Sequence, residues 1–236
     1  EGGRPDLSDI FHAIHDVPDL RRIRFMTSYP ADMTPRIIQS IADLPKVCEH
    51  VHVPCQAGDD DTLRAMHRTY NSGYYRDLIA RIRDTIPNVA ISSDVIVGFP
   101  GETDAQFRNT YRMLEDLRLD TVHVACYSVR PGTEASKTMP DNVPQDVKKA
   151  RLHEIEALQE RVLGDISDAL LGQQVEVLVE DDASKVNRTG APQWRGRTRQ
   201  NKLMYFPAGE RDLRGEEVKV RVEKVSPWAL QGELVA

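Results

Sequence analysis

The sequence is poor in cysteine, and the three cysteines that it has form no motif. Cys48, Cys55 and Cys126 are odd in number and widely spaced among 236 residues, which excludes a disulfide framework and a close-spaced metal motif. We interpret them as small core residues, because unpaired cysteine is commonly buried. A chain without a disulfide framework is typical of a reducing compartment, so we expect a cytoplasmic protein.

Long apolar runs and a strong charge imbalance are also absent. No stretch approaches the roughly 20 apolar residues of a membrane-spanning helix, and no signal peptide is visible, so we expect no membrane partner. The formal net charge of -6 at pH 7 argues against a polyanion-binding surface over the whole molecule. The sequence begins at Glu1 instead of methionine, and we expect it to be a piece of a longer protein.

What the sequence does contain, in its first 144 residues, is an alternation of strand-like and helix-like segments. The four strand-like segments are residues 21–30, 49–58, 92–103 and 121–133. Segments with apolar residues at helical spacing follow the first three of them, and the third of these helices would begin at a capping box of Thr103 and Gln106. This order predicts an α/β fold with a parallel sheet and helical crossovers.

Polar residues stand at or near the carboxyl ends of the expected strands. They are Thr27 and Ser28, then Gln56, then Asp94 with Gly98, then Tyr127 and Ser128. In parallel α/β folds this rim binds ligands. Asp94 would then be a hydrogen-bond acceptor in a cleft, and Gly98 and Gly101 would let a ligand approach the backbone closely. A capped strand end with turn glycines fits the same pattern.

After Pro144 the pattern changes to one long helix and then short strands. Residues 145–171 form a continuous helical run, which we expect to connect a domain at residues 1–144 to a second domain at residues 172–236. The second domain is rich in alternating β-branched residues separated by glycine and proline. We therefore expect a small all-β barrel there, of a size that folds as a nucleic-acid-binding module.

The expected barrel carries a local excess of positive charge. Between Ala183 and Gly209 there is no acidic residue, and the six basic ones are Lys185, Arg188, Arg195, Arg197, Arg199 and Lys202. Arg195, Arg197 and Arg199 occupy alternate positions along the chain and would share one face of a strand. With Trp194 beside them and Tyr205 further on, they suggest phosphate contacts and stacking on unpaired bases of RNA. The alternative is a solvated charged face.

Several segments resemble successive motifs of the radical-SAM methylthiotransferases. They are "RIRFMTSYP", "HVHVPCQAGDDDTLRAMHRTY", "AISSDVIVGFPGETDAQF" and "YSVRPGTEAS", followed by "GRTRQNKLMYF" and "GEEVKVRVEKVSPWALQGELV". The first four are similar to the last four strands of a partial parallel β/α barrel, and the last two are similar to the TRAM domain that ends these enzymes. The "SVRPGT" motif and the basic loop look most like the branch that adds a methylthio group to C2 of N6-isopentenyladenosine next to the anticodon of tRNA.

The resemblance also implies cofactors whose ligands this chain lacks. Members of the family hold a 4Fe-4S cluster through a CxxxCxxC motif, together with S-adenosylmethionine, and a second cluster in an amino-terminal domain. Neither set of cysteines is present here, so we expect both clusters to have their ligands outside this chain. We expect no metal site within it, and the chain alone would not catalyse the reaction.

The residues at the strand ends acquire roles from the same resemblance. Lining the S-adenosylmethionine cleft would be Gln56, Asp94, Gly98, Tyr127 and Arg130. None of them is expected to act as a general acid or base, because the cofactor carries the chemistry. Two alternatives remain open, a sister enzyme that modifies a ribosomal protein and a non-catalytic RNA-binding protein with a degenerate barrel.

Overall fold

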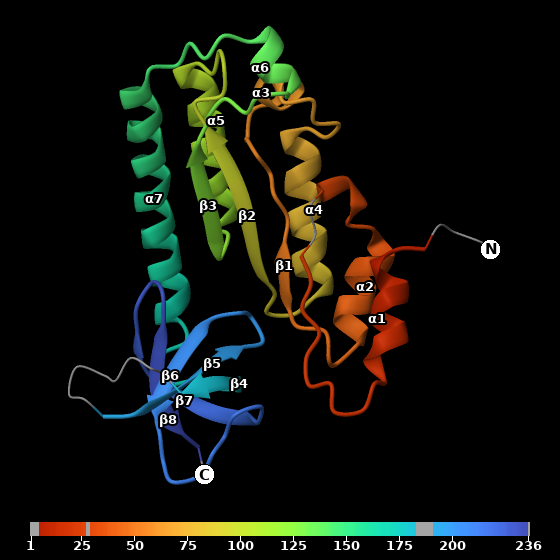
Figure 1. The fold of residues 1–236 in the computed structure, drawn as a ribbon, viewed down its shortest axis with the longest axis vertical. Coiled ribbons are helices and arrows are strands. Elements are labelled where there is room, and N and C mark those ends of the chain that lie inside the picture. The colour runs from red at the N-terminus through yellow and green to blue at the C-terminus, as the bar shows by residue number, and fades with distance from the viewer. Residues whose placement is uncertain (1–4, 27–28, 183–190, 236) are drawn as a thin grey trace.

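The computed structural model describes residues 5–26, 29–182 and 191–235. Figure 1 shows a parallel sheet among helices, the long helix α7 beside the sheet, and a small barrel below it. In the part of the chain described, the sheet has three strands and the barrel is closed with five. This is the α/β fold with a following all-β barrel that the sequence predicts. None of the described helices combines the length and the apolar character needed to cross a membrane.

The sheet consists of parallel strands in the order β1-β2-β3. β1 (His50–His52) pairs with β2 (Ala90–Val97), and β2 pairs with β3 (Thr121–Cys126). The strands point toward the top of Figure 1, where the loops at their carboxyl ends gather. Their amino ends face the barrel.

Apart from α7, the described α-helices begin at polar residues whose side chains cap the first turn. α4 (Ser72–Thr85) follows Asn71, whose side chain accepts a hydrogen bond from the Tyr74 backbone. α5 (Asp104–Leu117) begins at the capping box of Thr103 and Gln106 that the sequence predicts. The shorter helices are α1 (Leu7–His15), the 3-10 helix η1 (Pro30–Asp32), α2 (Pro35–Asp43), α3 (Asp60–Ala65) and α6 (Glu134–Thr138).

The described part of residues 21–30, which is 21–26 with 29 and 30, does not form the predicted strand. Among its described residues, only Ile23 pairs with a neighbouring segment, through an isolated parallel bridge to Val47. The flanking Arg22 and Arg24 turn their side chains to the barrel, where they donate hydrogen bonds to Glu217 and to the backbone of Thr198. The segment therefore contacts the barrel instead of joining the sheet. The described part of the sheet has three strands, where four were expected.

The predicted strand at residues 49–58 is also shorter than expected. It ends at His52, and one further parallel bridge joins Gln56 to Val95. Pro54 lies between these pairings, and proline has no N–H to donate to the ladder. Gln56 itself has a φ of 67°, so the chain turns there and leaves the sheet.

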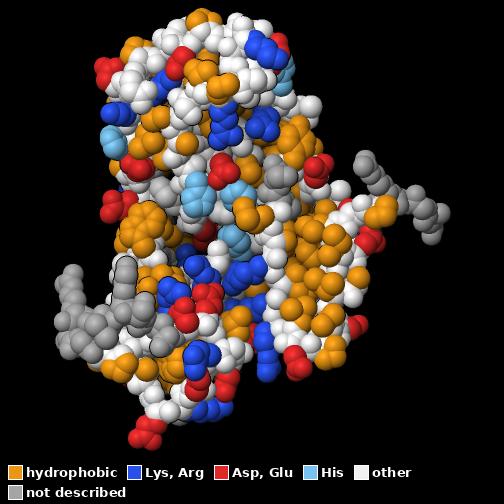
Figure 2. All heavy atoms as spheres, viewed as in Figure 1, with side chains coloured by type: hydrophobic (Ala, Val, Ile, Leu, Met, Phe, Trp, Pro, Cys, Tyr) orange, Lys and Arg blue, Asp and Glu red, His pale blue; other side chains and the backbone are white. Residues whose placement is uncertain are grey.

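The two faces of the sheet differ in composition. Val51 and Val95 are fully buried in a core with residues of α4, α5 and α7. Because successive strand residues alternate between faces, the register puts His52, Asp94 and His123 on the opposite face. No described helix covers these polar residues, and their face opens toward the hollow in Figure 2.

Helix α7 (Gln145–Asp168) connects the sheet to the barrel, as the sequence predicts. It packs along β3 through Ile155, Leu158 and Val162. The barrel strands, in spatial order, are β4 (Gln174–Asp182), β5 (Gln193–Thr198), β6 (Leu203–Pro207), β8 (Leu230–Leu234) and β7 (Glu217–Val225). Their inward residues form a separate apolar core, so the barrel has an interior of its own.

Candidate functional site

A cleft of about 620 Å³ lies over the carboxyl halves of β2 and β3. Four residues that the sequence analysis proposed for cofactor binding line it together, and they are Gln56, Asp94, Tyr127 and Arg130. Gln56 comes from the turn after β1, Asp94 from the open face of β2, and the other two from the segment after β3. Parallel strands bring these distant residues to one edge because their carboxyl ends meet there.

The fifth proposed residue, Gly98, does not line the cleft. Its φ is +71°, a conformation that glycine adopts without strain. A Cβ atom there would lie 2.3 Å from Cγ of Lys148, so the space left by the missing side chain holds this lysine and not a ligand. The expectation that Gly98 lets a ligand approach the backbone is therefore corrected: the glycine makes room for the Lys148 side chain of α7.

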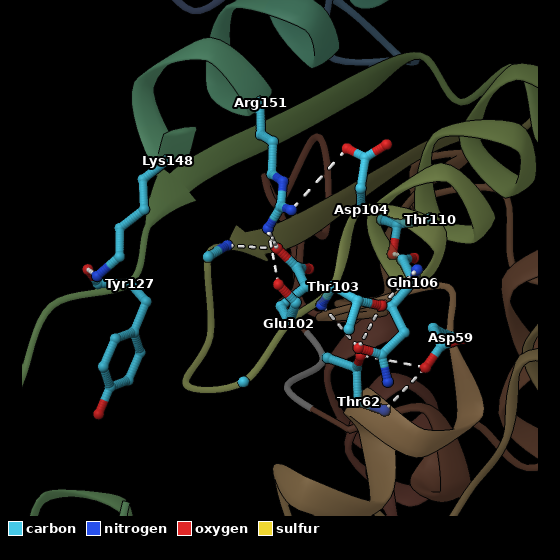
Figure 3. Close-up of polar contacts among 12 residues, drawn as sticks. Asp59, Thr62, Glu102, Thr103, Asp104, Gln106, Thr110, Tyr127, Lys148 and Arg151 are labelled. Atoms are coloured by element: carbon cyan, nitrogen blue, oxygen red, sulfur yellow. Dashed lines mark hydrogen bonds and ion pairs between the residues drawn. The ribbon is translucent and has the colours of Figure 1, made fainter. Parts of the chain in front are cut away.

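The turn after β2 is held in place by a buried ion pair. Glu102 accepts hydrogen bonds from the Gly98 N–H at 2.6 Å and from Nη1 of Arg151 at 2.8 Å. Burial raises the pKa of Glu102, although the Gly98 N–H and Arg151 both favour the carboxylate. Figure 3 shows Arg151 reaching from α7 to this carboxyl group. The turn beside the cleft is thus fixed to α7.

A second cation of α7 holds the segment after β3. Lys148 is almost fully buried, and its Nζ donates to the Tyr127 carbonyl at 3.2 Å and to Asp141 at 2.5 Å. The same ammonium lies 5.2 Å from the centre of the Tyr127 ring, within the range of a cation–π contact. Figure 3 shows the Tyr127 ring extending away from Lys148. Helix α7 therefore positions one wall of the cleft.

The cleft offers both an acceptor and unsatisfied donors. The side chain of Asp94 is 42% exposed and lies 3.3 Å from Nε2 of His52. Oη of Tyr127 and Nε of Arg68 are buried and have no hydrogen-bond partner among the described residues. Unsatisfied buried polar atoms call for a ligand or water. A ligand with hydroxyl or amino donors and with acceptor atoms, such as S-adenosylmethionine, fits this set.

An iron–sulfur cluster does not fit the described residues. Within residues 5–26, 29–182 and 191–235, no group of three cysteine, histidine or acidic side chains is placed to hold a metal. Cys48 and Cys55 lie in the core, and burial raises the pKa of the Cys55 thiol to about 12. Cluster ligands must be thiolates, so we assign no step of chemistry to a cluster on this chain.

Four of the six basic residues proposed for RNA binding are described; they lie at two kinds of place, and each of the four has an acidic partner. Of the three arginines predicted to share one strand face, Arg195 and Arg197 lie on the outer face of β5, where they pair with Asp181 and Glu180 of β4. Arg199 and Lys202 instead face the sheet, where they pair with Glu49 and Asp120. Lys185 and Arg188, like Thr27 and Ser28, lie outside the described residues.

The prediction that Trp194 stacks on a base beside these arginines is wrong. Its side chain belongs to the barrel core and the residue is only 7% exposed. The alternation that turns Arg195 outward turns its neighbour Trp194 inward. Tyr205 pairs with Arg195 in the register and is half-buried.

Sequence reasoning missed a row of histidines on the open face of the sheet. His50 and His52 of β1 and His123 of β3 share this face, with the rings of the last two 6.3 Å apart. Burial lowers the pKa of His50 to about 4, with Arg24 adding to the effect. The signal was present in "HVHV" and "TVHVAC", where histidine alternates with valine.

Comparison with known proteins gives the class of this chain. Residues 2–114 match the Radical SAM superfamily and residues 168–235 match the TRAM domain. The chain therefore contains a Radical SAM region followed by a TRAM domain, and the closed barrel is consistent with the latter. The superfamily implies S-adenosylmethionine and iron–sulfur chemistry in general.

Relatives with a known name are similar over almost the whole chain. The tRNA-2-methylthio-N(6)-dimethylallyladenosine synthase of Roseiflexus sp. (strain RS-1) is 46% identical over 98% of this chain and 48% of its own length. The protein of the same name from Herpetosiphon aurantiacus is 44% identical over 99% of this chain and 52% of its own. One from Dehalococcoides mccartyi is 42% identical over 98% and 54%. The chain thus spans about half the length of the curated relatives that it matches.

Proposed function

We propose that this chain works as part of an enzyme that adds a methylthio group to C2 of N6-isopentenyladenosine next to the anticodon of tRNA. One observation carries the proposal: relatives named as synthases of this kind are 42–46% identical to almost the whole chain. The similarity runs through the Radical SAM region, α7 and the TRAM domain. A ribosomal-protein methylthiotransferase and a non-catalytic RNA-binding protein are the alternatives.

In this proposal the cleft beside β2 and β3 binds S-adenosylmethionine. Asp94 accepts a hydrogen bond from a ribose hydroxyl or from the amino group, and Gln56, Tyr127 and Arg130 form the remaining polar walls. Gly98 contributes indirectly, because it admits the Lys148 side chain that holds Tyr127. These residues position the cofactor, and none of them needs to move a proton in the reaction.

The cofactor and two 4Fe-4S clusters supply the sulfur and methyl chemistry in the complete enzyme. We propose that the cluster ligands lie outside this chain, because its buried cysteines are unsuited to the task. The part of the enzyme described by this chain would bind S-adenosylmethionine at the sheet and tRNA at the barrel, and would hold the two in a fixed relation.

Contacts to the tRNA backbone are assigned to the TRAM barrel. Arg195 and Arg197 keep about two fifths of their side chains exposed, and their carboxylate partners are similarly exposed. Such surface pairs are weak, so phosphate groups can replace the carboxylates. Arg199 and Lys202 are more buried and would contribute mainly to the positive electrostatic potential of the barrel. Lys185 and Arg188 belong to the same proposed set of RNA-binding residues.

Replacing Asp94 with alanine is expected to weaken binding of S-adenosylmethionine by roughly 1.5–3 kcal/mol, the range for a lost hydrogen bond to a charged group. Calorimetric titration of the enzyme with the cofactor measures this effect without requiring turnover. The control is Asp77→Ala, which removes an exposed carboxylate of α4. Unchanged affinity of the Asp94→Ala variant would make Asp94 a partner of His52 only.

The RNA part of the proposal is tested by titrating the chain with a tRNA anticodon stem-loop at several salt concentrations. The double variant Arg195→Ala/Arg197→Ala should bind more weakly, and the slope of log K against log salt should fall by roughly 0.7–0.9 for each lost phosphate contact. The control variant Arg161→Ala/Arg211→Ala removes two exposed arginines with acidic partners elsewhere. Wild-type affinity and slope in the Arg195/Arg197 variant would favour the ribosomal-protein alternative.

A further inference from the structure

The turn between β7 and β8 presents an exposed tryptophan. Trp228 is 68% exposed, whereas the other tryptophan of the chain, Trp194, is packed in the barrel core. The Trp228 ring is not part of the barrel core. An exposed apolar side chain of this size can mark a binding surface. The exposure of the Trp228 ring on the surface therefore requires an explanation other than packing.

The turn that carries Trp228 is closed by its own hydrogen bonds. The Ser226 N–H donates to the Ala229 carbonyl at 2.9 Å, and the Ala229 N–H donates to Oγ of Ser226 at 3.0 Å. Pro227 precedes the tryptophan and restricts the backbone further. The indole is therefore presented by an ordered turn, and binding to it would lose little conformational entropy.

Trp228 borders a groove of about 260 Å³ between the barrel and the sheet. Asn201 and Leu203 of the barrel, Leu163 of α7, and His50 of β1 line it as well. The lining therefore combines apolar surface and uncharged hydrogen-bonding groups with three charged residues, Asp120, Arg197 and Lys202.

The groove and the proposed cofactor cleft share one lining residue. His123 lines both cavities, and it lies next to Asp94 in the register of β2 and β3. Figure 2 shows histidine side chains gathered in the middle of this face, with lysine and arginine side chains below them toward the barrel. An RNA strand that enters past Trp228 would follow the open face of the sheet to the cleft.

The groove favours a base over a phosphate. Of its two cations, Lys202 pairs with the largely buried carboxylate of Asp120, and Arg197 is the one that the proposed function assigns to a phosphate on the outer face of β5. His50 is neutral at pH 7, because burial lowers its pKa to about 4, so its ring donates and accepts without carrying charge. Aromatic rings and neutral polar groups are what unpaired nucleobases contact in proteins.

We propose that this groove binds unpaired nucleobases of an RNA strand, with one base stacked on Trp228 and the next directed along His123 toward the cleft. The inference rests on the proposed function and deepens it, since it states which part of the tRNA the groove takes. It assigns Trp228 to positioning the anticodon loop, separately from the phosphate contacts of β5.

The test uses the intrinsic fluorescence of the two tryptophans. In a Trp194→Phe variant all tryptophan emission comes from Trp228, and the exchange breaks no hydrogen bond because Nε1 of Trp194 has none among the described residues. Titration with an anticodon stem-loop should quench this emission, whereas a fully paired RNA duplex should not.

Trp228→Ala should weaken stem-loop binding about tenfold, the effect of losing one stacked base. Trp228→Phe should retain part of the affinity, and the control Leu234→Ala removes an exposed apolar side chain of β8 and should change nothing.

The outcomes separate this inference from the function on which it rests. Stem-loop binding that leaves the emission and the Trp228→Ala affinity unchanged overturns the stacking site and leaves the proposed function standing. Failure of the unaltered chain to bind any RNA overturns the proposed function itself. Quenching by a peptide and not by RNA also overturns the stacking site, and makes the groove a protein-binding one.

Discussion

Replacing Arg151 with alanine is expected to destabilise the protein by about 3–5 kcal/mol, the range for removing one partner of a buried ion pair. The side chain of Arg151 is 7% exposed and that of Glu102 is 1% exposed. Without the arginine, Glu102 keeps the Gly98 N–H as its remaining strong partner, in a site where burial already disfavours the carboxylate. Urea unfolding should show a lower midpoint at an unchanged slope.

Two comparisons identify the buried charge as the cause. Arg161→Ala breaks an exposed pair of α7 with Glu115 and should cost less than about 1 kcal/mol. Combining Arg151→Met with Glu102→Gln removes both charges while the amide still accepts from Gly98, and should recover much of the loss. If Arg151→Ala were as stable as the control, α7 would not hold the turn beside the cleft through this pair.

The second large effect is expected from Arg22, which joins the barrel to the sheet. Its side chain is 2% exposed and donates to Glu217 at 2.6 Å, to Glu176 at 3.2 Å and to the Arg197 carbonyl at 2.8 Å. Arg22→Ala should remove about 3 kcal/mol of stability, since several charge-assisted hydrogen bonds are lost at once. It should also uncouple the unfolding of the barrel from that of the sheet and its helices.

Two spectroscopic probes can separate the parts. Both tryptophans lie in the barrel, whereas all the described α-helices lie outside it, so fluorescence reports the barrel and far-UV circular dichroism reports chiefly the helices. The two transitions should coincide in the unaltered chain and separate in Arg22→Ala. Arg21→Ala is the matched control, because Arg21 is the exposed neighbour. Coincident transitions in Arg22→Ala would contradict the anchoring role.

Much of the fold could be predicted from local sequence patterns, and four of the five residues proposed for the cleft line it, Gln56, Asp94 and Tyr127 from the polar strand ends and Arg130 from the family resemblance. The capping box of Thr103 and Gln106 and the polar strand ends Gln56 and Asp94 depend on neighbours along the chain, so the sequence shows them. The failed strand at residues 21–30 depends instead on Arg22 finding Glu217, which lies 195 positions away. No local pattern reports such a contact.

The basic residues of the barrel illustrate the same limit. Their own segment has no acidic residue, yet Arg199 pairs with Glu49, which lies 150 positions away. The local count of charges therefore overstated the positive field. The error over Trp194 was different, because the alternation that placed Arg195 outside already required the tryptophan to point inward. Gly98 could not be assigned from sequence, since the residue that fills its space comes from α7.

We propose above all that this chain is part of a tRNA methylthiotransferase. The most direct measurement is nucleoside mass spectrometry of tRNA from cells in which the gene encoding the chain has been deleted. The account predicts that the methylthio derivative of N6-isopentenyladenosine disappears, that the nucleoside without the methylthio group accumulates, and that restoring the gene reverses both changes. An unchanged level of the methylthio nucleoside after deletion, in cells with no second gene of this kind, would contradict the account.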